Sequence, residues 1–573
     1  MIRRLCAAAA TCATLHASAQ TFCNPLNLPY HFQAPGPVRR EAADPVIVLY
    51  QDKYWLFASK QIGYWWSDDL LNWHQVLPTG LPLSEYAPSI TVVNGRLVYM
   101  SSGNKGAFTT ADPVAGRWTP IGPYKPGAAD PELFQDTDGK VYLYDGCSDK
   151  TPLRVTRLDP VTLQPLGEFR NVIAYDTLHH GWENEPSAPG RAPWIEGSWM
   201  NKLNGRYYWQ YSAPGTQYAS YADGVYVSDH PEGPFVYQPY SPFSFKPTGF
   251  IAGAGHSSTF ADKTGNFWHI STGTISVRHM FERRLVLFPA AVLPDGQLMV
   301  DTYLGDYPQW APGRDTPVDG APANGGSPGA AEGDNHPRWM LLSYKKPATS
   351  SSTLNDTFAV SNAFDENIRT WWSAATPRPN EWVEVDLQKT CTVNAIQVNF
   401  ADQGIDADSL AGGDVLQPGD GYAYIIEGSR DHRKWAPLVS RRTNRDTPHD
   451  YTQLGAPAPV RYIRITSLHN PAGSLFSLYD LRVFGNVAGP APARVRNLTV
   501  NRDGRNAHLE WEPTDGAQFY IVRYGIKPDR LYGNYQVYDG HSLDIHALNT
   551  ETPYYFTVDA VNEAGVTKGV RPQ

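Results

Sequence analysis

A hairpin unit that recurs five times in the first half of the chain constrains the fold more than any other feature of the sequence. Each copy has an apolar run, a tight turn and an aromatic-rich run, which is typical of two antiparallel strands. Three of the turns contain Asn-Gly or Asp-Gly, which supply the positive φ angles that two-residue hairpin loops need. The copies are VIVLYQDKYWLFA from Val46, SITVVNGRLVYMS from Ser89, LFQDTDGKVYLYD from Leu133, SWMNKLNGRYYWQYS from Ser198 and STFADKTGNFWHIST from Ser258. The pattern predicts antiparallel β-sheets.

A second pair of strands follows the hairpins and ends near polar and aromatic turns, such as SDDLLNW from Ser67, TADPVAGRW from Thr110 and SDHPEGPF from Ser228. Four short strands per unit, repeated around a channel, form the blades of a β-propeller. Two β-sandwiches in series are the alternative, but they would not repeat one hairpin pattern at these intervals. We therefore predict a five-bladed β-propeller over residues 20–310.

One residue stands just before the first strand of each unit. In a propeller the first strands line the central channel, so these five residues would meet there. They are Asp44, Pro88, Asp130, Glu196 and His256. Three carboxyl groups in one channel repel one another, so the set indicates a function rather than turn formation. Glycoside hydrolysis with inversion uses such a set, with a protonated acid at the leaving oxygen and an ionised base that activates water.

The rest of the chain divides by composition. Residues 311–338 are rich in Pro, Gly and Ala and are predicted to form a linker or long loop. Residues 339–487 and 491–573 show short alternating strand patterns, which predict two β-sandwiches. Residues 1–19 combine a basic start, a small apolar stretch and Ala17-Ser18-Ala19, the layout of a signal peptide. We expect an all-β protein that is secreted or periplasmic, or associated with the cell surface.

The net charge of −9 excludes binding to nucleic acid through a general surplus of Lys and Arg. After residue 19 no apolar stretch approaches the roughly 18 residues of a membrane span. Two of the five cysteines fall in the predicted signal peptide, and Cys23, Cys147 and Cys391 are too few and too scattered for a disulfide framework or a zinc site. The expected partner is a poly- or oligosaccharide, with no nucleic acid and no membrane span, and we expect a monomer.

Residues 21–310 resemble glycoside hydrolase family 43. The resemblance rests on the five-bladed pattern, the Ala-Asp-Pro starts at Asp44 and Asp130, the Glu-Gly step at Glu196 and the Gly-His-Ser-Ser start at His256. It implies that Asp44 is the general base, that Glu196 is the general acid, and that Asp130 raises the pKa of the acid and orients it. No cofactor is expected for the chemistry. The family commonly has Pro after Glu-Gly, whereas this chain has Ser198, so this loop does not decide the substrate.

The same resemblance suggests further residues of the site, each with a structural alternative. His256 would lie near a channel-bound calcium ion, or be a hydrogen-bonded core histidine. Arg278 would reach the sugar, or pair with an acidic loop. Trp66 and Trp182 would stack on a sugar, or belong to the core. The segment HHGWENEPS from His179 is expected to form the rim of the active site rather than a metal site.

The sandwich at residues 339–487 resembles the F5/8 type C, or discoidin-like, domain, which has a galactose-binding-like fold and often binds galactose-type sugars as carbohydrate-binding module family 32. The motifs are AFDENIRTWWSA, WVEVDL, IIEGSRDHRKW, RYIRI and YDLRVFG. The resemblance implies a structural calcium ion on Asp365, Asn367, Thr370 and Asp480, and the domain would bind sugar or act as a spacer. Residues 491–573 resemble a fibronectin type III domain, an immunoglobulin-like sandwich that usually acts as a spacer.

Together with these patterns, the resemblance to family 43 implies an inverting, exo-acting glycosidase that releases terminal α-L-arabinofuranose from plant or microbial polysaccharide. The alternatives within the family are β-D-galactofuranosidase, β-xylosidase and exo-β-1,3-galactanase activity. A secreted sugar-binding protein with a catalytically silent propeller is an alternative outside enzymes, but the intact set of carboxylates argues against it. A sialidase-like propeller is a further rival, but SDDLLNW lacks the glycine of the sialidase turn.

Overall fold

The computed structural model describes residues 20–570 except 31–40, 84, 104–105, 124–126, 314–334, 405–420, 446 and 472–473. The predicted signal peptide and most of the predicted linker lie outside the described residues. The described residues form β-strands joined by turns, and their helices are the short 3-10 segments η1 (Gly181–Glu183), η2 (Asp356–Phe358) and η3 (Val360–Phe364). The all-β prediction is confirmed. No helix in the described parts of the chain is long and apolar enough to cross a membrane.

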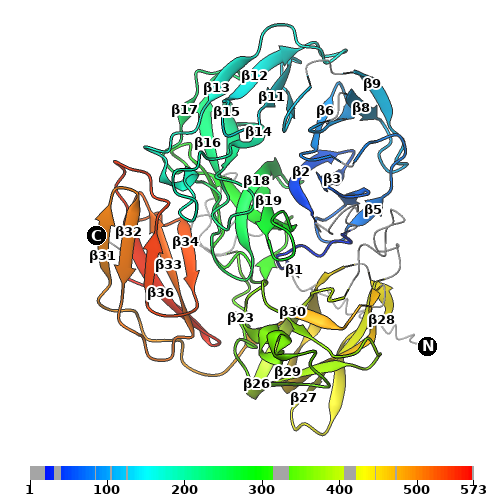
Figure 1. Ribbon diagram of the computed structural model, residues 1–573, viewed down its shortest axis with the longest axis vertical. Helices are drawn as coiled ribbons and strands as arrows, with labels where there is room; N and C mark the ends of the chain where they lie inside the picture. The colour runs from blue at the N-terminus through cyan, green and yellow to red at the C-terminus, as the bar shows by residue number, and fades with distance from the viewer. Residues whose placement is uncertain are drawn as a thin grey trace, which may run out of the picture.

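Five four-stranded antiparallel sheets follow one another along the chain and stand in a ring (Figure 1). The first is β2 (Ala43–Tyr50), β3 (Lys53–Ser59), β4 (Tyr64–Ser67) and β5 (His74–Val76). The second is β6 (Ser89–Val93), β7 (Arg96–Met100), β8 (Gly106–Thr110) and β9 (Thr119–Pro123). The third is β10 (Glu132–Gln135), β11 (Val141–Asp145), β12 (Leu153–Leu158) and β13 (Arg170–Ile173).

The two remaining sheets complete the ring. The fourth is β14 (Glu196–Leu203), β15 (Arg206–Ala213), β16 (Ala222–Ser228) and β17 (Val236–Tyr237). The fifth is β18 (Ala252–Ala261), β19 (Phe267–Thr274), β20 (Arg283–Val292) and β21 (Leu298–Val300). A separate short ribbon pairs β1 (Thr21–Phe22) with β22 (Gln309–Trp310), so the two ends of this part of the chain meet beside the ring. The sheets form a five-bladed propeller, as the repeat predicts.

The hairpin turns follow their sequences in two cases and differ in a third. Asn94 and Gly95, and likewise Asn204 and Gly205, all have positive φ angles and join strands through two residues. At Asp138-Gly139 only the glycine has a positive φ, and the strands are joined by residues 136–140. The predicted two-residue turn is therefore wrong there, because the side chain of Asp136 accepts hydrogen bonds within the loop and closes a longer turn.

Residues 340–486 form a sandwich around its own apolar core. Its strands are β23 (Met340–Leu341), β24 (Ala348–Ser350), β25 (Trp372–Ser373), β26 (Trp382–Phe400), β27 (Tyr422–Ser429), β28 (Trp435–Arg445), β29 (His449–His469) and β30 (Ser477–Asn486). The two longest strands, β26 and β29, pair with each other through register shifts that bend them. Such bending lets one continuous set of strands wrap around the core.

The C-terminal residues form a seven-stranded sandwich that packs against the third and fourth blades. One sheet contains β31 (Thr499–Asp503), β32 (Asn506–Glu510) and β35 (Ser542–Ile545), and the other contains β33 (Phe519–Gly525), β34 (Gly533–Val537), β36 (Tyr555–Asn562) and β37 (Gly565–Thr567). Apolar side chains of this sandwich and of the two blades share one cluster. Its assignment to fibronectin type III stays a prediction.

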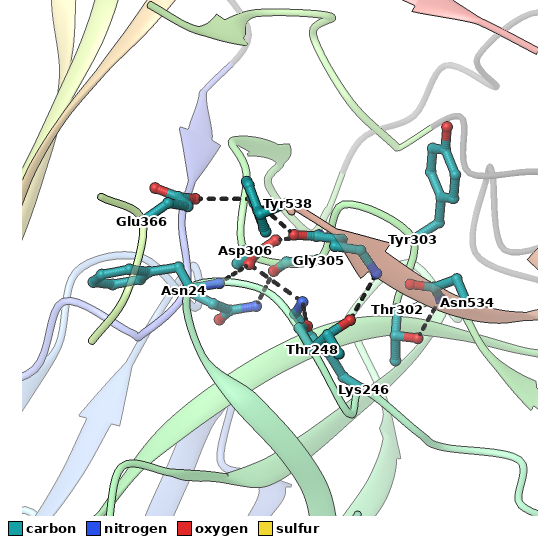
Figure 2. Close-up of polar contacts among 12 residues, drawn as sticks. Asn24, Lys246, Thr248, Thr302, Tyr303, Gly305, Asp306, Glu366, Asn534 and Tyr538 are labelled. Atoms are coloured by element: carbon teal, nitrogen blue, oxygen red, sulfur yellow. Dashed lines mark hydrogen bonds and ion pairs between the residues drawn. The ribbon is translucent and has the colours of Figure 1, made fainter. Parts of the chain in front are cut away.

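A buried polar network joins the propeller to both sandwiches (Figure 2). Asp306 of the propeller pairs with Lys246 at 3.2 Å and accepts a hydrogen bond from Gln536 of the C-terminal sandwich at 2.9 Å. Arg482 of the central sandwich pairs with Glu366 and donates to the backbone carbonyl of Asp306. These groups are almost wholly buried, so the two charges of each ion pair depend on one another, and the hydrogen bonds from Gln536 and Arg482 to Asp306 link the domains.

Arg482→Met should destabilise the full chain, because it leaves the Glu366 carboxylate buried without its cation. Removal of one partner of a buried ion pair typically costs about 3–5 kcal/mol of the free energy of unfolding. Chemical denaturation of the full-length variant measures this loss. Lys140→Ala, which breaks the exposed pair with Asp138, is the control and should leave the midpoint unchanged. Equal midpoints for both variants would contradict the role of the network.

Candidate active site

At or near the start of the first strand of each blade, one residue has the left-handed backbone conformation. The residues are Asp44 (φ 52°), Ala87 (49°), Asp130 (47°), Gly197 (67°) and His256 (47°). At four of these positions the backbone N–H donates to a hydroxyl of the preceding blade. The pairs are Asp44 with Thr272 (2.9 Å), Ala87 with Ser59 (2.7 Å), Asp130 with Ser102 (2.6 Å) and His256 with Ser212 (2.7 Å). Strained conformations of this kind persist where the surrounding structure holds them, often at functional sites.

Asp44, Asp130, Glu196 and His256 line one cavity of about 440 Å³ at the centre of the ring. The structure thus brings together four of the five predicted residues, although Asp44 and His256 lie within their strands and not before them. Pro88, the fifth, is not among the lining residues. A cavity of this size lies in the range of small-molecule sites.

Asp44 is held as a carboxylate. Burial alone would raise its pKa, but the positive charges of His256 and Arg283 and a hydrogen bond from Ser59 bring the pKa below its ordinary value. The Asp44 carboxylate lies 3.3 Å from Nδ1 of His256 and 3.2 Å from the guanidinium of Arg283, and it accepts the Ser59 hydroxyl at 2.5 Å. This environment suits a base that is ionised at neutral pH.

In contrast to Asp44, Glu196 and Asp130 have surroundings that favour their protonated forms. Burial and the nearby Asp130 carboxyl raise the pKa of Glu196, and burial and Asp44 raise the pKa of Asp130. Glu196 accepts hydrogen bonds from the hydroxyl of Tyr221 at 2.5 Å and from the thiol of Cys147 at 3.2 Å. Two neighbouring carboxyls that cannot both ionise retain a proton between them. This environment suits a group that donates a proton.

His256 lies between these carboxyls, 3.3 Å from Asp44 and 3.8 Å from Asp130. Burial lowers its pKa, but the charges of Asp44, Asp130 and Glu196 raise it to a net value above the ordinary one. The ring is therefore favoured as a cation. A protonated imidazole would neutralise part of the surrounding carboxylate charge, and the association of His256 with calcium stays a prediction.

Arg283, rather than Arg278, supplies the guanidinium of the cavity. Arg283 is buried and contacts Asp44, Glu41 and Thr216. Arg278 is absent from the lining residues, and its guanidinium donates to the hydroxyl of Tyr479 at 2.6 Å, in the central sandwich. The sequence prediction chose the wrong arginine because RHMFERR contains three candidates, and only the turn between β19 and β20 decides which of them faces the cavity.

Neither predicted tryptophan lies in the cavity. Trp182 is fully buried in the cluster shared with the C-terminal sandwich, and its indole N–H donates to Tyr237 at 2.9 Å. This position excludes contact with a sugar in the cavity. Trp66 lies on β4, two strands out from the channel, and stacks on His74 with the ring centroids 4.2 Å apart. Trp182 therefore packs in the core and Trp66 packs beside the core, instead of stacking on a sugar.

The aromatic side chains that do line the cavity come from loops. They are Tyr86, Trp194, Tyr218 and Phe281. The loop between β13 and β14 supplies Trp194, Arg191 and Glu185, and its η1 segment packs against the C-terminal sandwich. The histidines of HHGWENEPS are bound to carboxylates, His179 to Asp176 and His180 to Glu183, so they do not converge as a metal site. Loop residues give no periodic signal in the sequence, which is why Trp194 was missed.

The residues predicted to bind calcium lie in the central sandwich. Asp365 accepts hydrogen bonds from Thr370 at 2.6 Å and from the backbone of Asn367 at 3.1 Å, and Asp480 accepts the backbone N–H of Glu366 at 2.9 Å. Burial raises the pKa of Asp365 to about 6. Burial, Glu366 and Asp365 raise the pKa of Asp480 well above its ordinary value. The half-buried carboxyl of Asp365 and the buried carboxyl of Asp480 fit a hard cation in their donor chemistry.

Family comparisons agree with this arrangement. Residues 35–297 match the family model described as glycosyl hydrolases family 43. The chain contains a family 43 glycosyl hydrolase domain. Residues 347–479 match the model of the F5/8 type C domain. The predicted resemblances to glycoside hydrolase family 43 and to the F5/8 type C domain are confirmed.

Curated relatives of the family 43 domain carry several activities in their names. A β-xylosidase of Xylanibacter ruminicola is 31% identical over 176 residues, which are 25% of this chain and 51% of that protein. An arabinoxylan arabinofuranohydrolase of Paenibacillus polymyxa is 29% identical over 36% of this chain and 37% of its own length. A β-D-galactofuranosidase of Aspergillus niger is 27% identical over 34% of this chain and 64% of its own length. The chain thus spans less than two thirds of each of these relatives.

Proposed function

We propose that this protein is an inverting, exo-acting glycoside hydrolase that releases terminal α-L-arabinofuranose from plant or microbial polysaccharide. The observation that carries the proposal is the difference between the electrostatic environments of Asp44 and Glu196 in the cavity. The environment of Asp44 lowers its pKa, whereas the environment of Glu196 raises its pKa. Glycoside hydrolysis by a pair of carboxyl groups needs one ionised and one protonated carboxyl at the same pH.

In the proposed reaction, Asp44 accepts a proton from a water molecule as the water oxygen attacks the anomeric carbon. Glu196 gives its proton to the glycosidic oxygen as the bond to the anomeric carbon breaks. Asp130 keeps the proton on Glu196 through repulsion, and His256 and Arg283 keep Asp44 ionised. The products are the free sugar with inverted anomeric configuration and a chain shortened by that sugar.

The sugar is proposed from the names of the relatives and the shape of the cavity. One relative is named an arabinofuranohydrolase, and aromatic walls suit the apolar face of a sugar ring. β-D-Galactofuranosidase, β-xylosidase and exo-β-1,3-galactanase activity are the alternatives. A sugar-binding protein with a silent propeller is the alternative from another class. We further propose that the protein is exported, is a monomer and uses its sandwiches as sugar-binding or spacer domains.

Asp44→Asn and Glu196→Gln test the proposed roles with the 4-nitrophenyl glycosides of α-L-arabinofuranose, β-D-xylopyranose, β-D-galactofuranose and β-D-galactopyranose. Asp44→Asn should abolish release from the accepted substrate, because no group then activates the water. Glu196→Gln should lower turnover of oligosaccharides about 10²- to 10⁴-fold, and less so for aryl glycosides that leave without a proton. Proton NMR of the first product should show the inverted anomer. Unchanged turnover in either variant would remove that residue from its role.

Asp130→Asn should move the alkaline limb of the pH profile of kcat/KM to lower pH. The proposed acid limb reports ionisation of Asp44, and the alkaline limb reports loss of the proton from Glu196. Without the Asp130 charge the pKa of Glu196 falls, so Glu196 loses its proton at a lower pH. Asp138→Asn, an exposed change in the same blade, is the control and should keep the wild-type profile. An unmoved alkaline limb in Asp130→Asn would contradict this account.

We also propose that the F5/8 type C domain holds a structural calcium ion at Asp365 and Asp480, with Asn367 and Thr370 beside them. Calcium should then raise the thermal midpoint of chelator-treated protein, because an ion that binds only the folded state stabilises it. Asp480→Asn should remove the response. Asp356→Asn, an exposed change close by, should keep it. Equal midpoints with chelator and with calcium in the wild type would overturn the proposal.

A further inference from the structure

Four of the five junctions between neighbouring blades are closed by a hydroxyl group. Each hydroxyl belongs to the second strand of a blade, or to the residues just after it, and accepts the N–H of the left-handed residue that starts the next blade. These hydroxyls belong to Ser59, Ser102, Ser212 and Thr272. Two of them also donate to a cavity carboxylate, Ser59 to Asp44 at 2.5 Å and Ser102 to Asp130 at 2.7 Å. We call each of these four hydroxyls a hydroxyl latch. It accepts a backbone N–H of the next blade, and in the first two blades it also donates to a carboxylate of the cavity.

The junction of the third and fourth blades has a thiol at this place. Cys147 follows the end of β11 by two residues, as Ser102 follows the end of β7 by two residues. The thiol donates to Oε2 of Glu196 at 3.2 Å. The backbones are joined here by Ser148 and Ile195, which exchange two hydrogen bonds of 3.0 and 3.1 Å. The junction therefore closes without a hydroxyl.

Trp194 holds the thiol in place. Its indole N–H donates to Sγ of Cys147 at 3.1 Å, and its ring lines the cavity. A thiol that accepts this hydrogen bond directs its own proton away from the indole, toward the carboxyls. The sulfur of Cys147 donates to Glu196 and lies within 4.8 Å of a carboxylate oxygen of both Glu196 and Asp130. The thiol sits between the two carboxyls that the electrostatics favour as proton carriers.

The exchange of oxygen for sulfur changes how well the anion of Glu196 is stabilised. A hydroxyl donates a strong hydrogen bond to a carboxylate and favours the ionised form, as Ser59 does for Asp44. A thiol is a weak donor. The other groups that face Glu196 are Tyr221, which donates to it, His256, whose protonated form lowers the pKa of Glu196, and the carboxyls of Asp130 and Asp44. A serine at position 147 would add a strong donor to the first two and favour ionisation of Glu196.

We propose that Cys147 is a positioning residue that replaces the hydroxyl latch of the other blades, so that Glu196 keeps its proton at the pH at which Asp44 is ionised. The inference rests on the proposed role of Glu196 as the general acid. It adds that the alkaline limit of the pH range over which the enzyme works also depends on the sulfur atom of Cys147. In this proposal Trp194 lines the cavity and also orients the sulfur atom of Cys147.

Cys147→Ser and Cys147→Ala separate this role from simple packing. Cys147→Ser should move the alkaline limb of kcat/KM to lower pH, with about a three- to tenfold loss of rate on that limb, because a strong donor is added. Cys147→Ala should leave the alkaline limb near that of the wild type, because it adds no donor. A packing role predicts the reverse order, since serine is the closer replacement in size. Cys391→Ser, in the buried core of the sandwich, is the matched control.

A measurement that does not need turnover completes the test. Carbon-13 NMR of the protein labelled at glutamate carboxyls, assigned through Glu196→Gln, should show a lower pKa for Glu196 in Cys147→Ser than in the wild type. Equal values in the two proteins would overturn the inference even if the enzyme is active. A wild type that hydrolyses no glycoside would instead overturn the proposed function, while the NMR comparison would still decide the effect of Cys147.

Discussion

The arrangement of the whole molecule depends on a few charges buried where its three domains meet. Lys246 and Asp306 come from the propeller, while Glu366 and Arg482 come from the central sandwich. Taking such charges out of water is unfavourable unless every partner is in place. Each ion pair lies within one domain, and hydrogen bonds from Gln536 and Arg482 to Asp306 join the domains, so another placement would leave buried polar groups of the network without their partners. An apolar cluster beside it, with side chains from all three parts, adds burial to this specificity.

The chemistry of the centre follows from a second constraint, the convergence of blade starts. Three carboxyls and one imidazole are brought together by backbone that is held in the left-handed conformation. The charges then decide the protonation states. Asp44 has two cations close by, whereas Glu196 has a carboxyl and a thiol, so the same burial has opposite outcomes for the two acids. The asymmetry comes from the neighbours of each acid, since both are buried.

The C-terminal sandwich contributes to the cavity without touching it. It packs against η1 in the loop between β13 and β14, where the N–H of Thr550 donates to the carbonyl of His179 at 2.9 Å. A side chain at Gly181 would collide with the carbonyl of Leu548, so only glycine allows this close approach. The same loop continues to Trp194 in the cavity wall. A domain predicted as a spacer thus also supports one wall of the site.

The sequence by itself determined the repeated unit and the residues at its start. Strand alternation and Asn-Gly turns are local properties, and a repeat places equivalent residues equivalently, so Asp44, Asp130, Glu196 and His256 could be found without a structure. Tertiary structure alone decided which other side chains reach them. Arg283, and not Arg278, lines the cavity, and Trp182 packs in the apolar core, because the positions of loop residues and domain contacts follow no sequence period. Cys147 shows the same limit. It can be compared with the hydroxyls of the four other blades only because the fold places all of them at equivalent junctions.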